Sequence, residues 1–185
     1  MRKNFGVKSW FYPQPVLIIA TYDKNGSPDA MNAAWGGLYD GNKVELCLSA
    51  GHKTTKNIRA TGAFTVSFAD AANLVASDYV GLASANTEPK KMEKSGFHLT
   101  KSQFVNAPLI DELPVAMECK LVKINEDGNV IGEIVNVSAD ESVLGEDGTI
   151  DFAKFRPISF EPVHSGYHVL GERVGNAFQD GAALK

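Results

Sequence analysis

VELCLSAGHKTTKNIRATGAF, residues 44–64, changes its pattern twice and indicates how the whole chain is built. Its first part alternates apolar and polar residues, as half-buried strands do, and small residues end the alternation at 49–51. A His-Lys-Thr-Thr run at 52–55 leads into a short helical pattern, and alternation resumes at 63–68. The stretch therefore predicts a strand, a short helix beginning near Thr54, and a second strand.

The junction between this strand and this helix can form an anion site. Free N–H groups in the first turn of a helix carry partial positive charge, and Lys53 would add a full charge beside them. The hydroxyls of Ser49 and of Thr54 or Thr55 would donate hydrogen bonds, and the small residues at 50–51 allow close approach to the backbone. A phosphate monoester fits such a corner. The alternative is that Thr54 or Thr55 only caps the helix and Lys53 is solvated, and the fragment taken alone favours this alternative.

Composition limits the classes of protein to consider. The chain has 185 residues, 44% of them hydrophobic and 22% charged, which is typical of a globular protein and predicts one domain spanning 1–185. A net charge of −4 argues against nucleic-acid binding, because phosphate neutralisation needs a dense basic face. The apolar run at 16–20 is too short to cross a membrane. Cys47 and Cys119 lie in strand patterns without metal spacing, so they predict packed thiols in a cytoplasmic protein.

Strand patterns dominate both ends of the chain, and helical patterns occupy its middle. Asn25-Gly26 predicts a hairpin turn between strands at 15–23 and 27–35. The alternation at 63–68 predicts a half-buried strand whose aromatic and valine side chains face the core. This order predicts a mainly β fold, an antiparallel Greek-key barrel with helical insertions. The other predicted strands are 43–49, 114–124, 130–140 and 156–162, the predicted helices are 69–84 and 88–97, residues 107–114 form a loop or edge segment, and the tail 165–178 is partly irregular.

A second cluster of candidate binding residues lies at 31–37. Asn32 carries both a donor and an acceptor, and Trp35 offers a large flat surface. Ala33 and Ala34 leave room beside the backbone between them. Such a set can bind the carbonyl and imide edge of a planar heterocycle, although Trp35 would serve equally well as a core residue.

The remaining polar groups give weaker signals. Lys90 and Lys91 open a predicted helix, where the dipole does not favour cations, so they form a solvated face or reach an anion. His164 and His168 are four residues apart, but a nearby proline and glycine disfavour a helix and no third ligand is evident, so no metal site is predicted. No Gly-x-Ser-x-Gly elbow frames Ser49, and no catalytic nucleophile is predicted.

Several segments, taken in order along nearly the whole chain, match one family pattern. They are YPQPVLIIATYDKNGSPDAMNAAWGG (12–37), LSAGHKTTKNIRATGAFTVSF (48–68), YVGLASANTEPKKMEKSG (79–96), APLIDELPVAMECKL (107–121), IGEIVNV (131–137), RPISF (156–160) and YHVLGERVGNAF (167–178). Together they resemble the flavin reductase-like family, the FMN-binding split barrels, and within it the flavoredoxin group.

The resemblance implies an antiparallel FMN-binding split barrel that forms a homodimer, with FMN bound noncovalently near the dimer interface. It also implies which residues contact the cofactor. Those that match the loop beside the isoalloxazine ring are Asn32, Ala33, Ala34 and Trp35. Those that match the ribityl and phosphate segment, with the small Ala50 among them, are Ser49, His52, Lys53, Thr54 and Asn57.

Ser84, Ala85 and Lys91 match a small-residue pair and a more distant lysine of the family. The match departs from the family pattern, because Ala85 stands where the family commonly has Gly and the spacing to Lys91 is one residue longer. Tyr167 could approach the flavin from the tail of the chain.

The function implied is that of an FMN-dependent oxidoreductase of the NAD(P)H:flavin reductase kind, in which hydride passes to flavin N5 and electrons pass onward to a small-molecule or protein acceptor. No acid or base side chain is required for that hydride step. One alternative is a flavoredoxin-type electron-transfer protein that does not use NAD(P)H. Another is a non-catalytic binder of flavin, haem or another small molecule.

Overall fold

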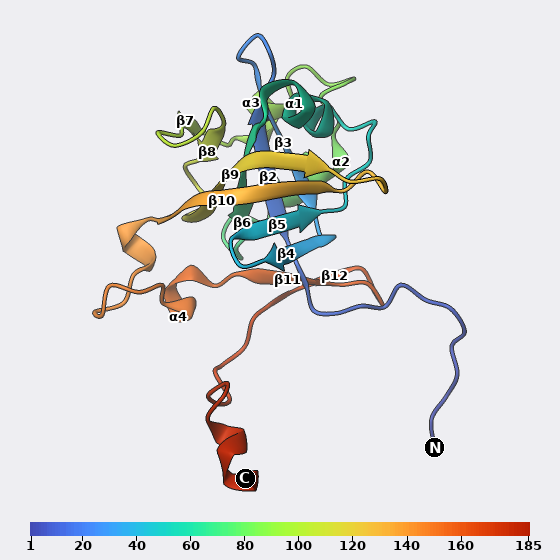
Figure 1. Ribbon diagram of the computed structural model, residues 1–185, viewed down its shortest axis with the longest axis vertical. Helices are drawn as coiled ribbons and strands as arrows, with labels where there is room; N and C mark the ends of the chain where they lie inside the picture. Colours follow the sequence, from blue (N-terminus) through green and yellow to red (C-terminus); the bar gives the residue numbers. More distant parts are fainter.

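A seven-stranded antiparallel sheet with the order β3-β2-β6-β9-β10-β5-β4 forms the body of the molecule (Figure 1). The computed structural model covers residues 1–185 and describes every side chain except that of residue 183. The strands of this sheet are β2 (Leu17–Tyr22), β3 (Pro28–Ala33), β4 (Gly36–Asp40), β5 (Lys43–Leu46), β6 (Ala63–Phe68), β9 (Val115–Ile124) and β10 (Val130–Ala139).

The connection between β3 and β4 shows that this sheet is curled. The two strands lie at opposite ends of the sheet order, yet only Ala34 and Trp35 separate them in the chain. Seven flat strands spaced by about 4.8 Å would place the two edges roughly 29 Å apart. The three Cα–Cα steps across the connection span at most about 11 Å. The sheet must therefore bend round until its edges approach, which confirms the predicted antiparallel split barrel.

Smaller elements surround the barrel. β1 (Gln14–Pro15), β11 (Ile158–Glu161) and β12 (Gly166–Val169) form a second sheet, and β7 (Leu99–Lys101) pairs with β8 (Pro108–Ile110). Three helices pack on β3, with α1 also contacting β2 (Figure 1). The helices are α1 (Lys53–Thr61), α2 (Leu74–Leu82), α3 (Lys91–Ser95) and α4 (Phe152–Phe155), with 3-10 turns η1 (Glu141–Val143) and η2 (Asp180–Leu184).

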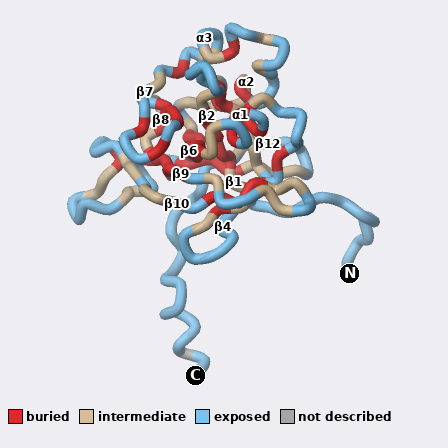
Figure 2. The backbone as a smooth tube through the Cα atoms, turned by 45° about the horizontal axis from the view of Figure 1, so that its top comes forward, coloured by how far each residue is buried: buried red, intermediate tan, exposed pale blue. Residues whose placement is uncertain are grey.

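The core has two parts because β2 is buried on both of its faces. Ile18 packs with the apolar residues beneath the helices, such as Val80 of α2. Ile19 points to the other face and packs with Phe64 and Leu46 inside the barrel. Residues that alternate along a strand face opposite sides of the sheet, so β2 supplies both clusters. Figure 2 shows that β2 is buried.

The structure corrects several expectations about individual elements. β6 is not half-buried, because Thr65 and Ser67 are also fully buried and the Thr65 hydroxyl donates to the Pro108 carbonyl at 2.6 Å. The segment that carries β8 covers this face, and its short edge strand agrees with the loop-or-edge prediction for 107–114. α2 is shorter than the predicted 69–84, and α3 begins at Lys91, three residues after the start of the predicted 88–97.

Both ends of the chain extend away from the barrel (Figures 1 and 2). Residues 1–12, called here the N-terminal arm, are exposed throughout, and so are the described side chains of 170–185. Among the helices of the described residues, none has the length and apolar character needed to span a membrane.

Candidate functional site

Two predicted site segments meet at the start of α1. Asn86, in the loop after α2, donates from Nδ2 to the Gly51 carbonyl at 3.1 Å. Its Oδ1 accepts a hydrogen bond from Lys56 Nζ at 3.1 Å, so the same side chain also holds α1. These bonds bring residues 49–53 together with 84–86, and we call the exposed surface formed by these two segments the α1 corner.

The first turn of α1 presents backbone N–H groups that its N-cap side chain leaves free. His52 is the N-cap residue of α1, and it makes no side-chain hydrogen bond to the first turn. The N–H groups of that turn therefore carry the partial positive charge of the helix terminus without a cap. Ser49 is exposed beside them, and Gly51 N–H lies 3.4 Å from its Oγ. Uncapped N–H groups and an exposed hydroxyl are the kinds of donor that bind an anion.

Lys53, which the alternative interpretation placed in solvent, is partly exposed and paired with a carboxylate. Its Nζ lies 3.1 Å from Asp23 Oδ2, across the turn that follows β2. The N–H groups of Ser27 and Asn25 also donate to the Asp23 carboxylate, and these bonds, together with Lys53, hold the pKa of Asp23 below its usual range. The Lys53 charge is therefore balanced by a carboxylate, and an incoming anion would share the ammonium with Asp23.

Three further predicted residues lie behind the α1 corner rather than on its surface. Asp29 of β3 accepts hydrogen bonds from Thr54 Oγ1 at 2.5 Å and from Lys91 Nζ at 3.3 Å. Lys91 is 3% exposed and Asp29 1%, so this ion pair is buried. Asn57 is also buried and donates to the Thr21 hydroxyl at 3.0 Å.

The hydroxyls at the start of α1 do not cap the helix, which makes the capping interpretation wrong. Thr54 and Thr55 lie inside the helix, which begins at Lys53. Thr55 donates to the Ser49 carbonyl at 2.9 Å, and Thr54 donates to Asp29. These hydroxyls instead anchor α1 to the loop before it and to β3.

The Asn32–Trp35 stretch, the end of β3 and the connection to β4, lies near α2. Asn32 Nδ2 donates to the Ser77 carbonyl of α2 at 3.0 Å, which fixes the direction of its amide. Ala33 and Ala34 are half-buried. Trp35 is 57% exposed, so its interpretation as a core residue is wrong.

A hollow of about 340 Å³ adjoins Trp35. Its lining is mostly apolar and includes Ala34, Gly36, Phe11 and Gln14. A flat exposed ring beside an apolar hollow is a surface on which a planar molecule can stack. The Asn32–Trp35 stretch therefore has the form expected of a ring-binding loop.

Tyr167 is placed near the same stretch. Its hydroxyl donates to Asp78 Oδ1 of α2 at 2.7 Å. Burial and the Asp78 carboxylate raise the pKa of Tyr167 to about 12, against a smaller opposite effect of Asn32. Tyr167 is therefore a neutral donor at physiological pH, and it ties β12 to the helix that holds Asn32.

Several residues of this region were missed by reasoning from the sequence. Asp23 and Asp29 are 30 and 62 positions from the lysines they bind, and Asn86 is 35 positions from Gly51. A hairpin signal places Asp23 beside a turn but does not reveal its partner. Such pairs depend on tertiary contacts, which no local pattern encodes.

The cysteines and histidines do not extend the site. Cys119 is buried in β9, where burial raises the pKa of its thiol to about 12, whereas Cys47 is exposed, so the expectation of packed thiols holds for Cys119 only. The Nδ1 atom of His164 lies 3.2 Å from Glu161 Oε1 on an exposed turn. Among the described side chains, no group of three or more His, Cys, Asp or Glu is arranged to hold a metal ion.

Comparison with known proteins identifies related folds. A family model described as "Flavin reductase like domain" matches residues 9–159. The solved flavoredoxin of Desulfovibrio vulgaris (Miyazaki F) is 35% identical, covers 98% of this chain and 100% of its own, and superposes with a TM-score of 0.93. A flavoredoxin from Methanosarcina acetivorans is 26% identical over all of both chains, with a TM-score of 0.89. The 2-nitrobenzoate 2-nitroreductase of Pseudomonas fluorescens is 25% identical, with coverages of 90% and 85% and a TM-score of 0.76.

Proposed function

Because this chain belongs to the flavin reductase-like family, we propose that it binds FMN and works as a flavin-dependent oxidoreductase. The α1 corner carries this proposal. Uncapped N–H groups, the Ser49 hydroxyl and the Lys53 ammonium converge there, and these are groups that a phosphate monoester needs. The residues present therefore fit the phosphate end of FMN.

The proposed site extends from this corner to Trp35. Ser49, Ala50, His52 and Lys53 bind the phosphate and ribityl chain, and the tied loop of Ser84 and Ala85 closes the corner. The isoalloxazine ring lies by Asn32, Ala33, Ala34 and Trp35, where the apolar hollow accommodates one of its faces. Thr54, Asn57 and Lys91 hold these segments in place through their buried bonds to β2 and β3.

When bound, FMN would supply the redox chemistry by accepting hydride from NAD(P)H at N5 and delivering electrons to an acceptor. The protein binds and orients the ring. Asn32, fixed by its bond to the Ser77 carbonyl, directs its amide at the ring edge. The neutral Tyr167 hydroxyl donates to Asp78 and so keeps α2, which holds Asn32, in register with β12.

A second function, electron transfer without nicotinamide, is favoured by one observation. The two structures described as flavoredoxins resemble this chain more closely than the nitroreductase does, with TM-scores of 0.93 and 0.89 against 0.76. On this proposal the donor and the acceptor are both proteins.

Anaerobic mixing separates these functions. The purified protein is loaded with FMN and mixed with NADH or NADPH in the absence of oxygen, and the flavin absorbance is followed. Rapid bleaching supports the reductase, whereas bleaching only by a protein donor supports electron transfer. A protein that takes up no FMN and no yellow colour contradicts both and leaves a binder of another ligand.

We also propose that the chain forms a homodimer with FMN near the interface. The arms at both ends of the chain support this, because they place apolar side chains such as Phe11 and Phe178 in water. Apolar side chains gathered on the surface are typical of protein–protein interfaces.

A further inference from the structure

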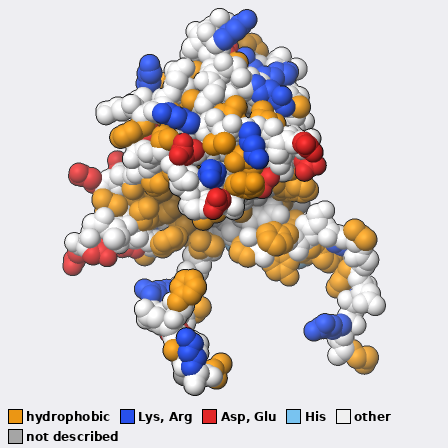
Figure 3. Space-filling view, in the orientation of Figure 1, with side chains coloured by type: hydrophobic (Ala, Val, Ile, Leu, Met, Phe, Trp, Pro, Cys, Tyr) orange, Lys and Arg blue, Asp and Glu red, His pale blue; other side chains and the backbone are white. Residues whose placement is uncertain are grey.

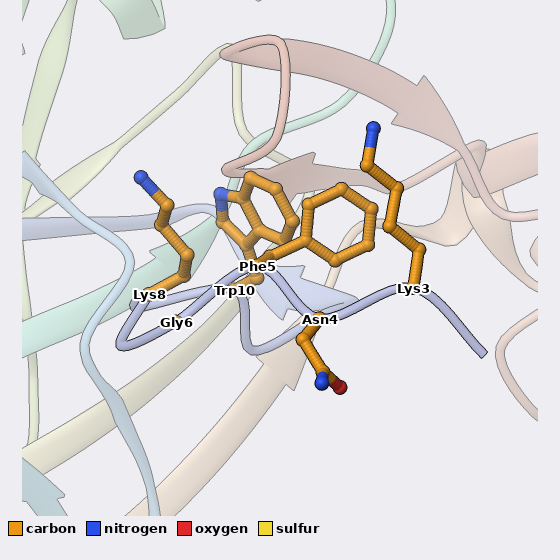
Figure 4. Close-up of a pocket in the computed structure, with 6 residues that line it drawn as sticks. All are labelled: Lys3, Asn4, Phe5, Gly6, Lys8 and Trp10. Atoms are coloured by element: carbon orange, nitrogen blue, oxygen red, sulfur yellow. The ribbon is translucent and has the colours of Figure 1, made fainter.

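The N-terminal arm carries an aromatic cluster built from its own side chains. The rings of Phe5 and Trp10 pack at a centroid distance of 5.1 Å, tilted by 59°. Lys3 Nζ lies 5.4 Å from the Phe5 ring and Lys8 Nζ 5.9 Å from the Trp10 ring (Figure 4). These four residues, which we call the aromatic knob, line a hollow formed by the arm alone.

At the base of the barrel, a cavity of about 480 Å³ lies open to the surface. Its lining is almost wholly apolar and includes Phe68, Met117, Val137 and Phe152, and we call this cavity the socket. Gln14 also lines it, with its Oε1 buried and without a hydrogen-bond partner. The volume is in the range that holds small organic molecules, so an aromatic side chain can enter.

The socket accommodates an apolar occupant, because its lining is almost wholly apolar. Trp10 of the arm carries a large apolar ring of this kind. Figure 3 shows apolar side chains gathered on the lower surface of the barrel and along both arms.

Charge also matches the arm to the border of the socket. The arm carries Arg2, Lys3 and Lys8, and the chain has no acidic residue before position 23. Residues 140–151 carry five carboxylates and no Lys or Arg, with Lys154 and Arg156 following. This acidic rim continues into the socket, because Ile150 and Phe152, beside the rim's last carboxylate, line it. A basic aromatic arm is complementary to an apolar socket with an acidic rim.

The knob of the same chain does not occupy the socket. Pro13 and Gln14 line the socket themselves, and the chain before them leads away from the barrel (Figure 1). We propose that the aromatic knob of one copy enters the socket of a second copy, with its lysines facing the acidic rim. This rests on the proposed homodimer, and the two-fold symmetry of a dimer makes the exchange reciprocal.

Paired serine substitutions test the apolar contact in the full chain. The variant Phe5→Ser/Trp10→Ser should raise the dimer dissociation constant by more than about 100-fold in analytical ultracentrifugation. Because the arm lies outside the barrel, circular dichroism should be unchanged. The matched control is Phe104→Ser/Val122→Ser, whose side chains are 56% and 50% exposed on other surfaces, and its dissociation constant should stay within about twofold of wild type. Equal values for wild type and the knob variant would overturn the proposal.

Charge reversal shows whether the arm acts on a second copy. One variant reverses the arm (Arg2→Glu, Lys3→Glu and Lys8→Glu), and another reverses exposed rim residues without hydrogen-bond partners (Glu141→Lys and Glu146→Lys). At low salt each variant alone should dissociate at least about tenfold more readily than wild type, because arm and rim no longer attract. An equimolar mixture should form heterodimers, because one arm-rim contact is then native and the other has its attraction restored.

The outcomes separate this inference from the functional proposals. Heterodimers from two weakened variants support reciprocal exchange. Variants that dimerise like wild type, or a mixture that stays monomeric, overturn the exchange. A monomeric wild type overturns the homodimer as well. FMN absorbance of wild type, measured at a protein concentration well above its dimer dissociation constant, reports the flavin proposal separately from the arm and rim substitutions.

Discussion

Lys53 reaches the α1 corner with its charge already balanced, because its ammonium lies 3.1 Å from an Asp23 carboxylate oxygen. Asp23→Asn keeps an oxygen for the turn N–H groups of Asn25 and Ser27 but removes the charge. An unbalanced Lys53 attracts a dianion more strongly. We therefore expect Asp23→Asn to increase the affinity for FMN several-fold without changing the affinity for riboflavin, which lacks the phosphate.

Lys53→Ala should lower the affinity for FMN roughly tenfold, which corresponds to ~1.4 kcal/mol of binding free energy. It should lower the affinity for riboflavin by less.

Titration of both flavins by fluorescence quenching measures these effects. Lys24→Ala is the matched control, because Lys24 is an exposed lysine in the same turn. It should leave both affinities unchanged. Equal losses of FMN and riboflavin in Lys53→Ala would remove Lys53 from the phosphate site.

The buried pair of Lys91 and Asp29 makes a second prediction. Asp29→Ala leaves a 3%-exposed ammonium without its carboxylate, and Thr54 loses its acceptor. We expect the free energy of unfolding to fall by about 3–5 kcal/mol in urea titrations. Glu126→Ala, at an exposed site, should change it by less than about 0.5 kcal/mol. A loss below about 1 kcal/mol for Asp29→Ala would show that Lys91 finds water or another partner.

The pair of His98 and Glu112 contributes to the stability of the fold in a pH-dependent way. The bond between His98 Nδ1 and the Glu112 carboxylate, 2.5 Å long, raises the pKa of His98 above its ordinary 6.5. Burial raises the pKa of Glu112, but the bonds from His98 outweigh it and lower that pKa below its ordinary 4.5. The pair therefore stabilises the fold most between about pH 4.5 and 6.5. Its contribution is lost as pH rises through the folded pKa of His98, and as pH falls through that of Glu112.

The measurement is an NMR titration of the His98 ring together with unfolding at several pH values. Glu112→Gln should bring the His98 pKa back toward 6.5 and flatten the pH dependence over this window. A His98 pKa that does not move in Glu112→Gln would contradict the pairing.

At the scale of elements, the sequence predicted the features that depend on neighbouring residues, such as turns and helix ends. Asn25-Gly26 marks the turn between β2 and β3, and Gly96 ends α3 with a φ of 74° that favours glycine. The sequence did not predict that β6 is covered on both faces, because its second cover, the segment of Pro108, lies more than 40 residues away. The alternating pattern suggests that Thr65 and Ser67 face solvent, because it contains no sign that the Pro108 segment covers them.

In the candidate site too, the features encoded by neighbouring residues were predictable and the tertiary contacts were not. Its strand end and helix start were predictable, since the sequence pattern 44–64 encodes both. The carboxylates that balance Lys53 and Lys91 were not, because each comes from the β2–β3 hairpin. Whether a lysine is solvated or paired depends on the partner that the fold supplies, and residue type alone does not contain that information.

β10 lies against the buried ring of Phe64 at Gly132, which gives an element-scale prediction. A Cβ at 132 would lie 2.8 Å from Phe64 Cε1, and Phe64 is fully buried, so the ring cannot move aside. Gly132→Ala should cost about 1–3 kcal/mol of unfolding free energy. Gly37→Ala, in β4 with open space at its Cβ, is the control and should be nearly neutral. An equally small effect at both positions would mean that β10 shifts freely at its irregular pairing with β9.

At the scale of the whole molecule, the curled sheet determines where the segments of the proposed site lie. Closing the barrel brings the β3 and β4 edges together at Ala34 and Trp35, and the helices packed on β3 bring the α1 corner to the same side of the sheet. Trp35 remains 57% exposed in a single copy. Excluding water from a bound ring therefore requires a further surface, and a second copy is the candidate that the exposed arms support.

This requirement links FMN retention to protein concentration. If a partner covers the ring, FMN binds the dimer more tightly than the monomer, and by linkage FMN must also strengthen the dimer. At a fixed free FMN concentration, we expect the fraction of protein carrying flavin to fall as the protein is diluted through its dimer dissociation constant. Sedimentation velocity read at the flavin and protein wavelengths measures both quantities in one sample. The Phe5→Ser/Trp10→Ser variant should lose flavin at higher protein concentration than wild type, whereas Phe104→Ser/Val122→Ser should follow wild type. A monomer that retains FMN as tightly as the dimer would place the whole site within one chain.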